Sequence, residues 1–210
     1  MPYTFGPQLR ERVATNLRTL PREGIDDPAL RQAGVAIVIV RSESDDEASV
    51  LLTKRPESLR RHAGQYALPG GRLDTGETVE QAALRELHEE LRLELGPDDI
   101  LGVLDDYPTR SGFRITPVVL WGGAAPVIEP DPVEVAYVLR IPFRELDDPR
   151  VPRLRPTEDG RPPVLSAPLP TMGSEVYAPT AAMLYQFREV AIRGLTTRVS
   201  HFDQPRFAWR

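Results

Sequence analysis

Residues 51–95 read LLTKRPESLRRHAGQYALPGGRLDTGETVEQAALRELHEELRLEL, and most of what the sequence implies about this chain follows from them. Within this stretch, TVEQAALRELHEEL (78–91) predicts an amphipathic helix, because apolar residues recur at helical spacing from Val79 to Leu91. Thr78 is of a residue type that commonly precedes the first turn of a helix. One face of this helix is therefore expected to be buried.

Three glutamates share one flank of the predicted helix. At about 100° per residue, Glu90 is rotated by about 40° from Glu86, and Glu89 lies about 60° to the other side. Like charges at these spacings destabilise a helix by about 0.2–0.5 kcal/mol per pair, so the arrangement favours a bound cation. Oxygen ligands without histidine or cysteine select a hard ion, which predicts Mg²⁺ or Mn²⁺. The alternative is a solvated acidic face that Arg85 and Arg92 partly neutralise.

The composition of the whole chain narrows the class of protein. The sequence has 210 residues, a net charge of -5 and no cysteine. This length favours one domain with an ample core, and the acidic balance argues against binding to duplex nucleic acid. No stretch approaches the roughly 20 apolar residues that cross a bilayer, and no leader segment is recognised, so we expect no membrane contact and a cytoplasmic location.

Strands dominate the rest of the predicted secondary structure. A short polar turn between the first two strands predicts a hairpin, and mixed strands with few helices favour a sheet between helices. In chain order the predicted elements are a helix at 7–20, strands at 34–40, 49–55, 100–107, 113–121 and 134–143, and a helix at 180–194. Prolines accumulate between Asp148 and Pro179, which predicts loops with a short edge strand at PPVLSA (162–167).

The glutamates belong to a longer pattern with fixed spacing. The pattern is G-x5-E-x7-R-E-U-x-E-E-x-x-U, where U is apolar, and its positions are filled by Gly71, Glu77, Arg85, Glu86, Leu87, Glu89, Glu90 and Leu93. This resembles the Nudix box. The resemblance implies an α/β fold, namely a Nudix α/β/α sandwich with a mixed β-sheet, in which the catalytic helix lies in a loop-helix-loop segment. Arg92 stands where the box usually has glycine, which bears on how the helix ends.

The resemblance also implies the chemistry and the residues that carry it. It implies hydrolysis of a nucleoside diphosphate linked to another moiety, with Mg²⁺ or Mn²⁺ as cofactor. The implied metal ligands are Glu86, Glu90, Glu89 and the carbonyl of Gly71. Glu89 is the implied general base, with Glu134, at the start of the predicted strand 134–143, as the alternative. Arg85 is expected to orient a glutamate through a bidentate bond.

The first half of the opening stretch resembles a motif of coenzyme A pyrophosphatases within the Nudix proteins. That motif is L-L-T-x-R-[SA]-x3-R-x3-G-x3-F-P-G-G, and residues 51–71 match it except at Pro56 and Leu68. Coenzyme A carries a 3′-phosphate besides its diphosphate, so its pocket needs additional fixed positive charge. The arginines expected to bind this substrate are Arg55, Arg60 and Arg61. Gly70 is expected to let the backbone approach the phosphates.

These inferences define an expected organisation and leave alternatives open. We expect an N-terminal helical extension (1–30), a Nudix domain (31–195) and a C-terminal tail (196–210). The expected partner is a small nucleotide substrate like coenzyme A. A homodimer is common in the family, and the sequence leaves the oligomeric state open. The alternatives are a Nudix enzyme for ADP-ribose or NADH, and a non-catalytic Nudix module that binds a nucleotide and regulates a partner.

Overall fold

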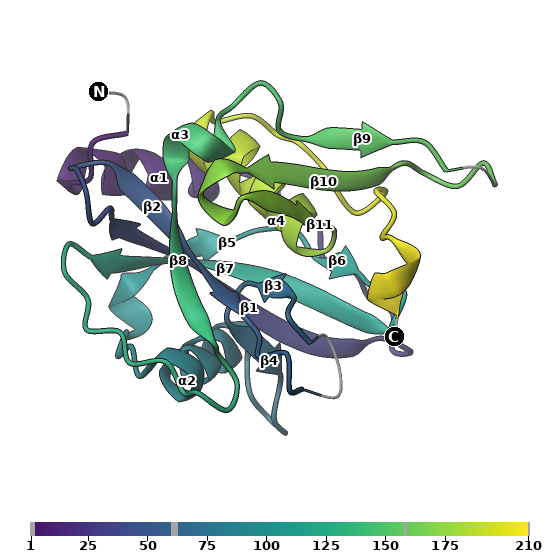
Figure 1. The fold of residues 1–210 in the computed structure, drawn as a ribbon, viewed down its shortest axis with the longest axis horizontal. Coiled ribbons are helices and arrows are strands. Elements are labelled where there is room, and N and C mark those ends of the chain that lie inside the picture. Colours follow the sequence, from purple (N-terminus) through teal and green to yellow (C-terminus); the bar gives the residue numbers. More distant parts are fainter. Residues whose placement is uncertain (1–2, 60–62, 158, 210) are drawn as a thin grey trace.

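The computed structural model describes residues 3–59, 63–157 and 159–209 (Figure 1). A mixed eight-stranded sheet forms its centre, built around β1 (Arg31–Arg41) and β7 (Phe113–Gly123). These two strands pair in parallel, starting from Arg31 opposite Phe113, whereas their other partners are antiparallel. Residues 33–40 of β1 are all buried, as the β-branched run in its sequence predicts for a strand that is covered on both faces.

The remaining strands of the sheet extend this pair on both sides. The strand order is β3-β2-β1-β7-β5, with β8 paired to β2, β4 to β1 and β6 to β7. The predicted hairpin is confirmed, because β1 and β2 pair antiparallel with Ile39 opposite Val50. The bounds are Ala48–Lys54 for β2, Tyr66–Ala67 for β3, Gly70–Arg72 for β4, Ile100–Val103 for β5, Tyr107–Pro108 for β6 and Tyr137–Pro142 for β8.

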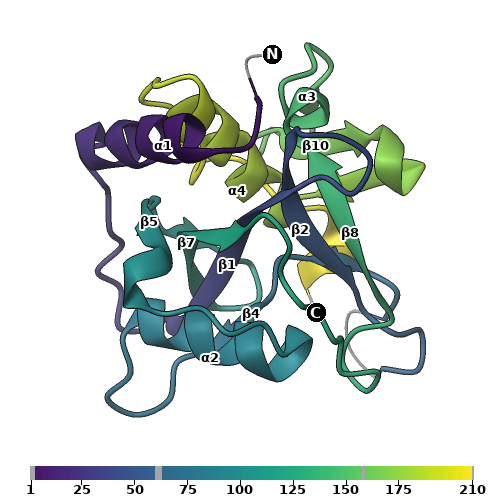
Figure 2. The same ribbon diagram turned by 90° about the vertical axis from the view of Figure 1, so that its left-hand side faces the viewer.

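Helices cover both faces of the sheet (Figure 2). Helix α2 (Val79–Leu91) packs with one face of β1 in a cluster that contains Ala36, Val38 and Val40. Helices α1 (Pro7–Thr19) and α4 (Thr180–Phe187) pack on the other face, with Val35, Ile37 and Ile39. The α/β/α sandwich with a mixed sheet is therefore confirmed. The shorter helices are α3 (Phe143–Leu146), η1 (Pro97–Asp99), η2 (Pro170–Met172), the π-helical turn η3 (Arg188–Ile192) and η4 (Arg206–Trp209).

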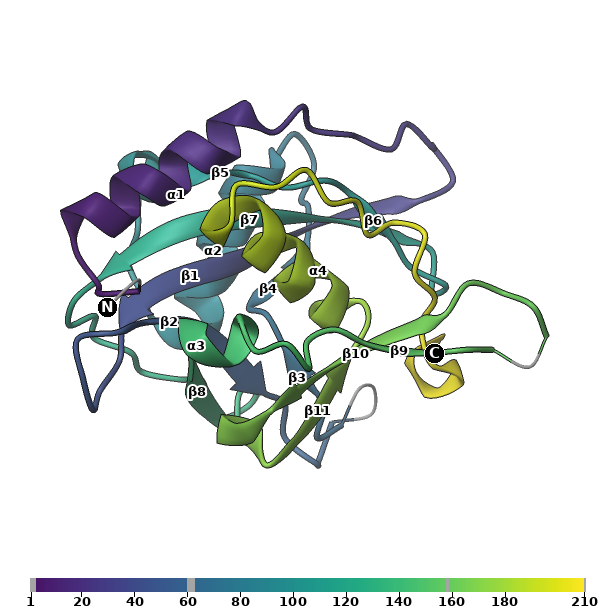
Figure 3. The same cartoon turned by 90° about the horizontal axis from the view of Figure 1, so that it is seen from above.

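The proline-rich region contains a second sheet that the sequence did not predict. Strand β10 (Val164–Leu169) lies between β9 (Arg153–Arg155) and β11 (Ser174–Tyr177). The strand predicted at 162–167 is confirmed by β10, but its predicted position at a sheet edge is wrong, since β10 is the central strand of three. Leu165, Ala167 and Leu169 alternate inward into the main core, which outweighs the loss of backbone donors at the prolines. Figure 3 shows the β9–β10 hairpin reaching beyond the rest of the molecule.

Two predicted strands are shorter than expected. The segment predicted as one strand at 100–107 is divided into β5 and β6 by residues that include the buried Asp105 and Asp106. Strand β8 begins at Tyr137, so Glu134 does not start a strand and instead lies in a turn. This turn forms because the backbone N–H groups of Glu134 and Val135 both donate to the carbonyl of Asp131.

Helix α2 ends at an arginine in the left-handed conformation. Arg92 has φ 52° and ψ 22°, and it is the only non-glycine residue with positive φ in the described part of the chain. Its backbone N–H donates to the carbonyl of His88, as glycine would do at this position. The helix therefore ends with the geometry that the usual glycine provides, at a cost in backbone strain.

Replacing Arg92 with glycine should stabilise the protein. A left-handed conformation costs a non-glycine residue roughly 1–2 kcal/mol, while glycine adds about 0.5–1 kcal/mol of unfolded-state entropy. The ion pair between Arg92 and Asp131 spans 3.8 Å and is partly exposed, so its loss matters little. We expect Arg92→Gly to raise the free energy of unfolding in urea by about 0.5–1 kcal/mol. Arg92→Ala is the control, because it loses the same ion pair and keeps the strain; an equal gain in both variants would contradict this explanation.

Candidate active site

The start of α2 is fixed by a local hydrogen-bond pair. The Thr78 hydroxyl accepts from the backbone N–H of Gln81 at 3.3 Å, and the Gln81 side chain accepts from the backbone N–H of Thr78 at 2.9 Å. Such a capping box satisfies N–H groups that would otherwise lack partners. The acidic residues of the helix are therefore held at defined positions relative to the strands below it.

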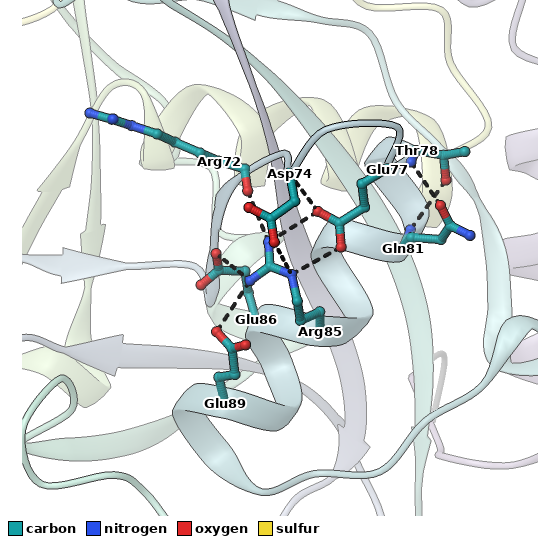
Figure 4. A network of polar contacts seen from close by, with 8 residues as sticks. All are labelled: Arg72, Asp74, Glu77, Thr78, Gln81, Arg85, Glu86 and Glu89. Atoms are coloured by element: carbon teal, nitrogen blue, oxygen red, sulfur yellow. Dashed lines mark hydrogen bonds and ion pairs between the residues drawn. The ribbon is translucent and has the colours of Figure 1, made fainter.

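Arg85 connects the loop between β4 and α2 to the acidic flank of α2 (Figure 4). Its Nε and Nη2 atoms donate to the two carboxylate oxygens of Glu77, at 2.9 and 3.1 Å. Its Nη1 atom donates to Glu86 at 3.0 Å and to Glu89 at 3.2 Å, and Nη2 also donates to the carbonyl of Arg72 at 2.9 Å. The bidentate bond expected of Arg85 is thus made with Glu77. The hydrogen bond that Arg85 donates to Glu77 lowers the pKa of the Glu77 carboxyl.

Three glycines allow α2, β1 and β4 to pack closely together. A Cβ atom on Gly34 of β1 would collide with the carbonyl of Val79, and one on Gly70 of β4 would collide with the backbone of β1. A Cβ atom on Gly71 would overlap the carboxylate of Glu86. The absence of a side chain therefore lets β4 lie against β1 and lets the Glu86 carboxylate lie against β4.

Glu90 is a buried carboxylate beside the same strand. It is only 4% exposed, and it accepts a hydrogen bond from the backbone N–H of Gly70. Burial raises the pKa of Glu90 to about 8, and the charge of Glu86 adds to this, while Gly70 and Arg55 act in the opposite direction. Glu90 forms no ion pair with any residue that the structure describes. A buried carboxylate without a bonded cation is costly, so this position favours a positive ligand.

Glu86 and Glu134 belong to the same electrostatic group. Burial raises the pKa of Glu86, whereas its hydrogen bond to Arg85 opposes the increase. The charge of Glu134 raises the pKa of both Glu86 and Glu90, so the turn brings Glu134 near them. The backbone holds this turn against the helix, because the N–H of Asp131 donates to the carbonyl of Glu90 at 2.8 Å. Glu134 itself is exposed.

A cavity of about 440 Å³ lies beside β4, on the sheet face that α4 covers. The strand β4 forms part of its wall through Gly70 and Gly71, which also contact the acidic group. Arg55 lines the cavity, and its Nε atom is buried without a hydrogen-bond partner among the described residues. Other lining residues come from β7, α4 and the C-terminal tail, namely Phe113, Ile115, Thr180, Met183 and Gln204. Arg60 and Arg61, predicted to bind substrate, lie outside the described residues.

The acidic group can be tested for its fit to a divalent cation. Within residues 3–59, 63–157 and 159–209, no three acidic or histidine side chains already surround one point as metal ligands. Arg85 instead engages both Glu86 and Glu89 (Figure 4). The donors nevertheless suit a hard ion, since they are oxygen atoms only and include the buried Glu90. Glu89 is 52% exposed, so it can turn without disturbing the core.

Sequence reasoning identified the acidic group but missed most of the cavity wall. The residues at 86, 89 and 90 were visible because their spacing is local to one helix. Phe113, Met183 and Gln204 come from three separated segments, and each taken singly reads as a packing or surface residue. The apolar pattern of the predicted helix at 180–194 is the available signal for Met183, but it predicts burial and not the cavity.

Comparison with known proteins identifies relatives across the middle of the chain. Residues 30–161 match the model of the NUDIX domain. The uncharacterized Nudix hydrolase NudL of Enterobacter sp. (strain 638) is 41% identical over 122 residues, which cover 55% of this chain and 59% of that protein. Nudix hydrolase 3 of Caenorhabditis elegans is 37% identical over 151 residues, which cover 68% and 62%. The chain thus spans less than two thirds of the length of these relatives.

The solved structures that resemble this chain include a MutT/nudix family protein from Enterococcus faecalis. The similarity covers 87% of this chain and 73% of that chain, with 14% sequence identity and a TM-score of 0.49.

None of the helices in the described part of this chain combines the length and apolar character needed to span a bilayer.

The buried Glu90 predicts a specific pH dependence of stability in metal-free protein. Its pKa rises from an ordinary 4.5 to about 8 on folding, so its contribution is most favourable below pH 4.5 and is lost as the pH rises toward 8. Glu90→Gln removes the charge and keeps an acceptor for Gly70. At about 1.4 kcal/mol per pKa unit, we expect this variant to gain roughly 2–4 kcal/mol over the wild type at pH 8 and little at pH 4.5, by urea unfolding in EDTA.

Glu89→Gln is the matched control for this measurement. Glu89 lies on the same helix but is more than half exposed, so the stability difference between this variant and the wild type should be similar at both pH values. If the wild type and Glu90→Gln instead lose stability equally between pH 4.5 and pH 8, Glu90 is not a buried, uncompensated carboxylate.

Proposed function

Because the chain belongs to the NUDIX domain family, we propose that it is a metal-dependent pyrophosphohydrolase that cleaves the diphosphate of coenzyme A or its derivatives. The observation that carries this proposal is the buried Glu90 beside β4, together with a cavity along the same strand whose described lining residues include no aspartate or glutamate. Such a site places carboxylates for cations on one side and space for an anionic substrate on the other. The products would be 3′,5′-ADP and 4′-phosphopantetheine, or its acylated form.

The proposed metal ligands are those that the Nudix box implies. Glu86, Glu90 and Glu89 would hold Mg²⁺ or Mn²⁺, with the carbonyl of Gly71 as a further ligand. The bound ion would neutralise the diphosphate and lower the pKa of an attacking water. Arg85 would keep its bonds to Glu77 and so hold the loop before α2 in place. Its bonds to Glu86 and Glu89 would break when these two carboxylates bind the cation.

The reaction itself is a displacement at phosphorus. The oxygen of water bonds to one phosphorus of the anhydride, the bridging P–O bond breaks, and the bridging oxygen leaves with the other phosphate. A carboxylate accepts the proton of the attacking water. Glu89 is our choice for this base, because it is half exposed and lies one residue from the buried Glu90. Glu134 is the alternative, since its charge acts on both Glu86 and Glu90.

Two features support coenzyme A as the substrate. Residues 51–71 resemble the motif of coenzyme A pyrophosphatases, and Arg55 of that motif lines the cavity with its buried Nε atom unpaired among the described residues. A guanidinium without a carboxylate partner is suited to phosphate oxygens. ADP-ribose or NADH is the competing substrate class, because Pro56 and Leu68 depart from the motif.

A substrate panel tests the proposed activity. Coenzyme A, acetyl-coenzyme A, ADP-ribose and NADH are each assayed with Mg²⁺ and with Mn²⁺, and kcat/KM is compared. We expect the highest kcat/KM for a coenzyme A form, with 3′,5′-ADP among the products and no turnover in EDTA. A higher kcat/KM for ADP-ribose or NADH would contradict the substrate assignment, and full turnover in EDTA would contradict the metal assignment.

A substitution at Gly71 tests the role of the contact between β4 and α2. A Cβ atom at this position overlaps only the flexible end of Glu86, and Gly71 does not have a positive φ, so Gly71→Ala should fold. Displacement of a catalytic carboxylate by about 1 Å can lower the rate roughly 100-fold, and we expect a loss of kcat of that order. Gly96→Ala is the control, because no atom lies within 4 Å of its added Cβ. Wild-type kcat in folded Gly71→Ala would exclude a role for the position of Glu86.

A further inference from the structure

The arginines around the cavity differ from most others in this protein. Most described arginines pair with a carboxylate, whereas Arg31, Arg55 and Arg72 form no ion pair with any residue that the structure describes. Arg55 and Arg72 line the cavity, and none of the described lining residues is aspartate or glutamate. The arginines around this cavity thus have no carboxylate partner among the described residues, which favours an anionic ligand.

Arg31 and Arg72 converge on one aromatic ring. The guanidinium carbon of Arg31 lies 4.0 Å from the centre of the Phe113 ring, and that of Arg72 lies 5.1 Å from it. Phe113 lines the cavity, and Arg31 is further held by a hydrogen bond to the carbonyl of Ser111 at 2.9 Å. Two like charges on one ring repel each other, so an anion bound between or beside them would relieve this repulsion.

This pair is separate from the group that would hold the diphosphate. Figure 4 shows the side chain of Arg72 pointing away from Glu86 and Glu89, although its carbonyl accepts from Arg85. Arg55, in contrast, acts electrostatically on Glu90. The proposed divalent cations and Arg55 would both face the diphosphate. A ligand with a diphosphate alone would leave Arg31 and Arg72 without a counter-ion.

We propose that Arg72, supported by Arg31 across Phe113, binds a phosphomonoester on the ribose of the substrate and thereby selects nucleoside diphosphate derivatives that carry a third phosphate. This inference rests on the proposed function and deepens it by naming a specificity-determining residue. A phosphomonoester carries a charge of about -1.5 to -2 at neutral pH, which matches two guanidinium groups. The planar guanidinium fork also binds phosphate oxygens in pairs, which an ammonium group cannot do.

Binding measurements test the assignment without turnover. Calorimetry compares the affinity of 3′,5′-ADP, 2′,5′-ADP and 5′-AMP for the full chain with Mg²⁺. We expect at least one bisphosphate to bind about 10- to 100-fold more tightly than 5′-AMP, as a charge-assisted hydrogen bond provides. In Arg72→Gln this ratio should fall to within about threefold of unity, and Arg72→Lys should restore part of it. The bisphosphate that shows the ratio identifies the position of the third phosphate.

Kinetics give a second readout of the same ratio. Two ratios of kcat/KM are measured, one for coenzyme A over dephospho-coenzyme A and one for NADPH over NADH. For the preferred pair, the ratio should fall by about 10- to 100-fold in Arg72→Gln. Arg18→Gln is the matched control, because it removes the same charge from an exposed ion pair on α1, outside the cavity. Its ratios should equal those of the wild type.

The outcomes separate this inference from the proposed function. Equal binding of all three nucleotides to the wild type, or a ratio that Arg72→Gln and Arg31→Gln leave unchanged, would overturn the inference even if coenzyme A is hydrolysed. If coenzyme A is not hydrolysed but the bisphosphate ratio depends on Arg72, the substrate assignment fails and the inference stands. A loss of thermal stability in Arg72→Gln with an unchanged ratio would show that Arg72 only packs on Phe113.

Discussion

The close approach of α2 to strands β1 and β4 determines the geometry of the whole site. Gly34 lets α2 approach β1, and Gly70 lets β4 approach β1, since a side chain on either would collide with backbone atoms. The consequence is that Glu90 becomes buried against the N–H of Gly70, and Glu86 lies directly over Gly71. Burial at this contact raises the pKa of both carboxyls, and the charge of Glu134 adds to the effect. A packing requirement of the backbone thus becomes an electrostatic property of the site.

Strand β4 separates two regions of opposite charge. The carboxylates lie on the side of α2. Arg55 and Arg72 line the cavity on the side of α4, where no aspartate or glutamate is among the lining residues that the structure describes. Arg55, Arg72 and Glu90 form no ion pair among the described residues, whereas Arg85 pairs with Glu77, Glu86 and Glu89 at the same time. A ligand with metal-bound phosphates at one end and a further anion at the other would compensate both regions together.

The sequence predicted the features that depend on local spacing and missed those that depend on distant contacts. The helix over 79–91 and the hairpin of β1 and β2 followed from capping, apolar periodicity and a polar turn. The second sheet was missed because prolines obscured the inward alternation of β10. The buried Asp105 and Asp106 were also missed, because their partners Arg198 and Arg22 come from opposite ends of the chain. The Phe113 part of the cavity depends on pairing between β1, β4 and β7, which no local pattern shows.

The most direct test of the central claim is the position of a metal ion relative to the contact between α2 and β4. Crystals soaked with Mn²⁺ would locate the ion by its anomalous scattering. We predict that the anomalous peak places the ion within bonding distance of the carboxylates of Glu86 and Glu90 and of the carbonyl of Gly71, with Glu86 turned away from Arg85. A peak elsewhere, with Glu86 still bonded to Arg85 and Glu90 still without a cation, would contradict the account.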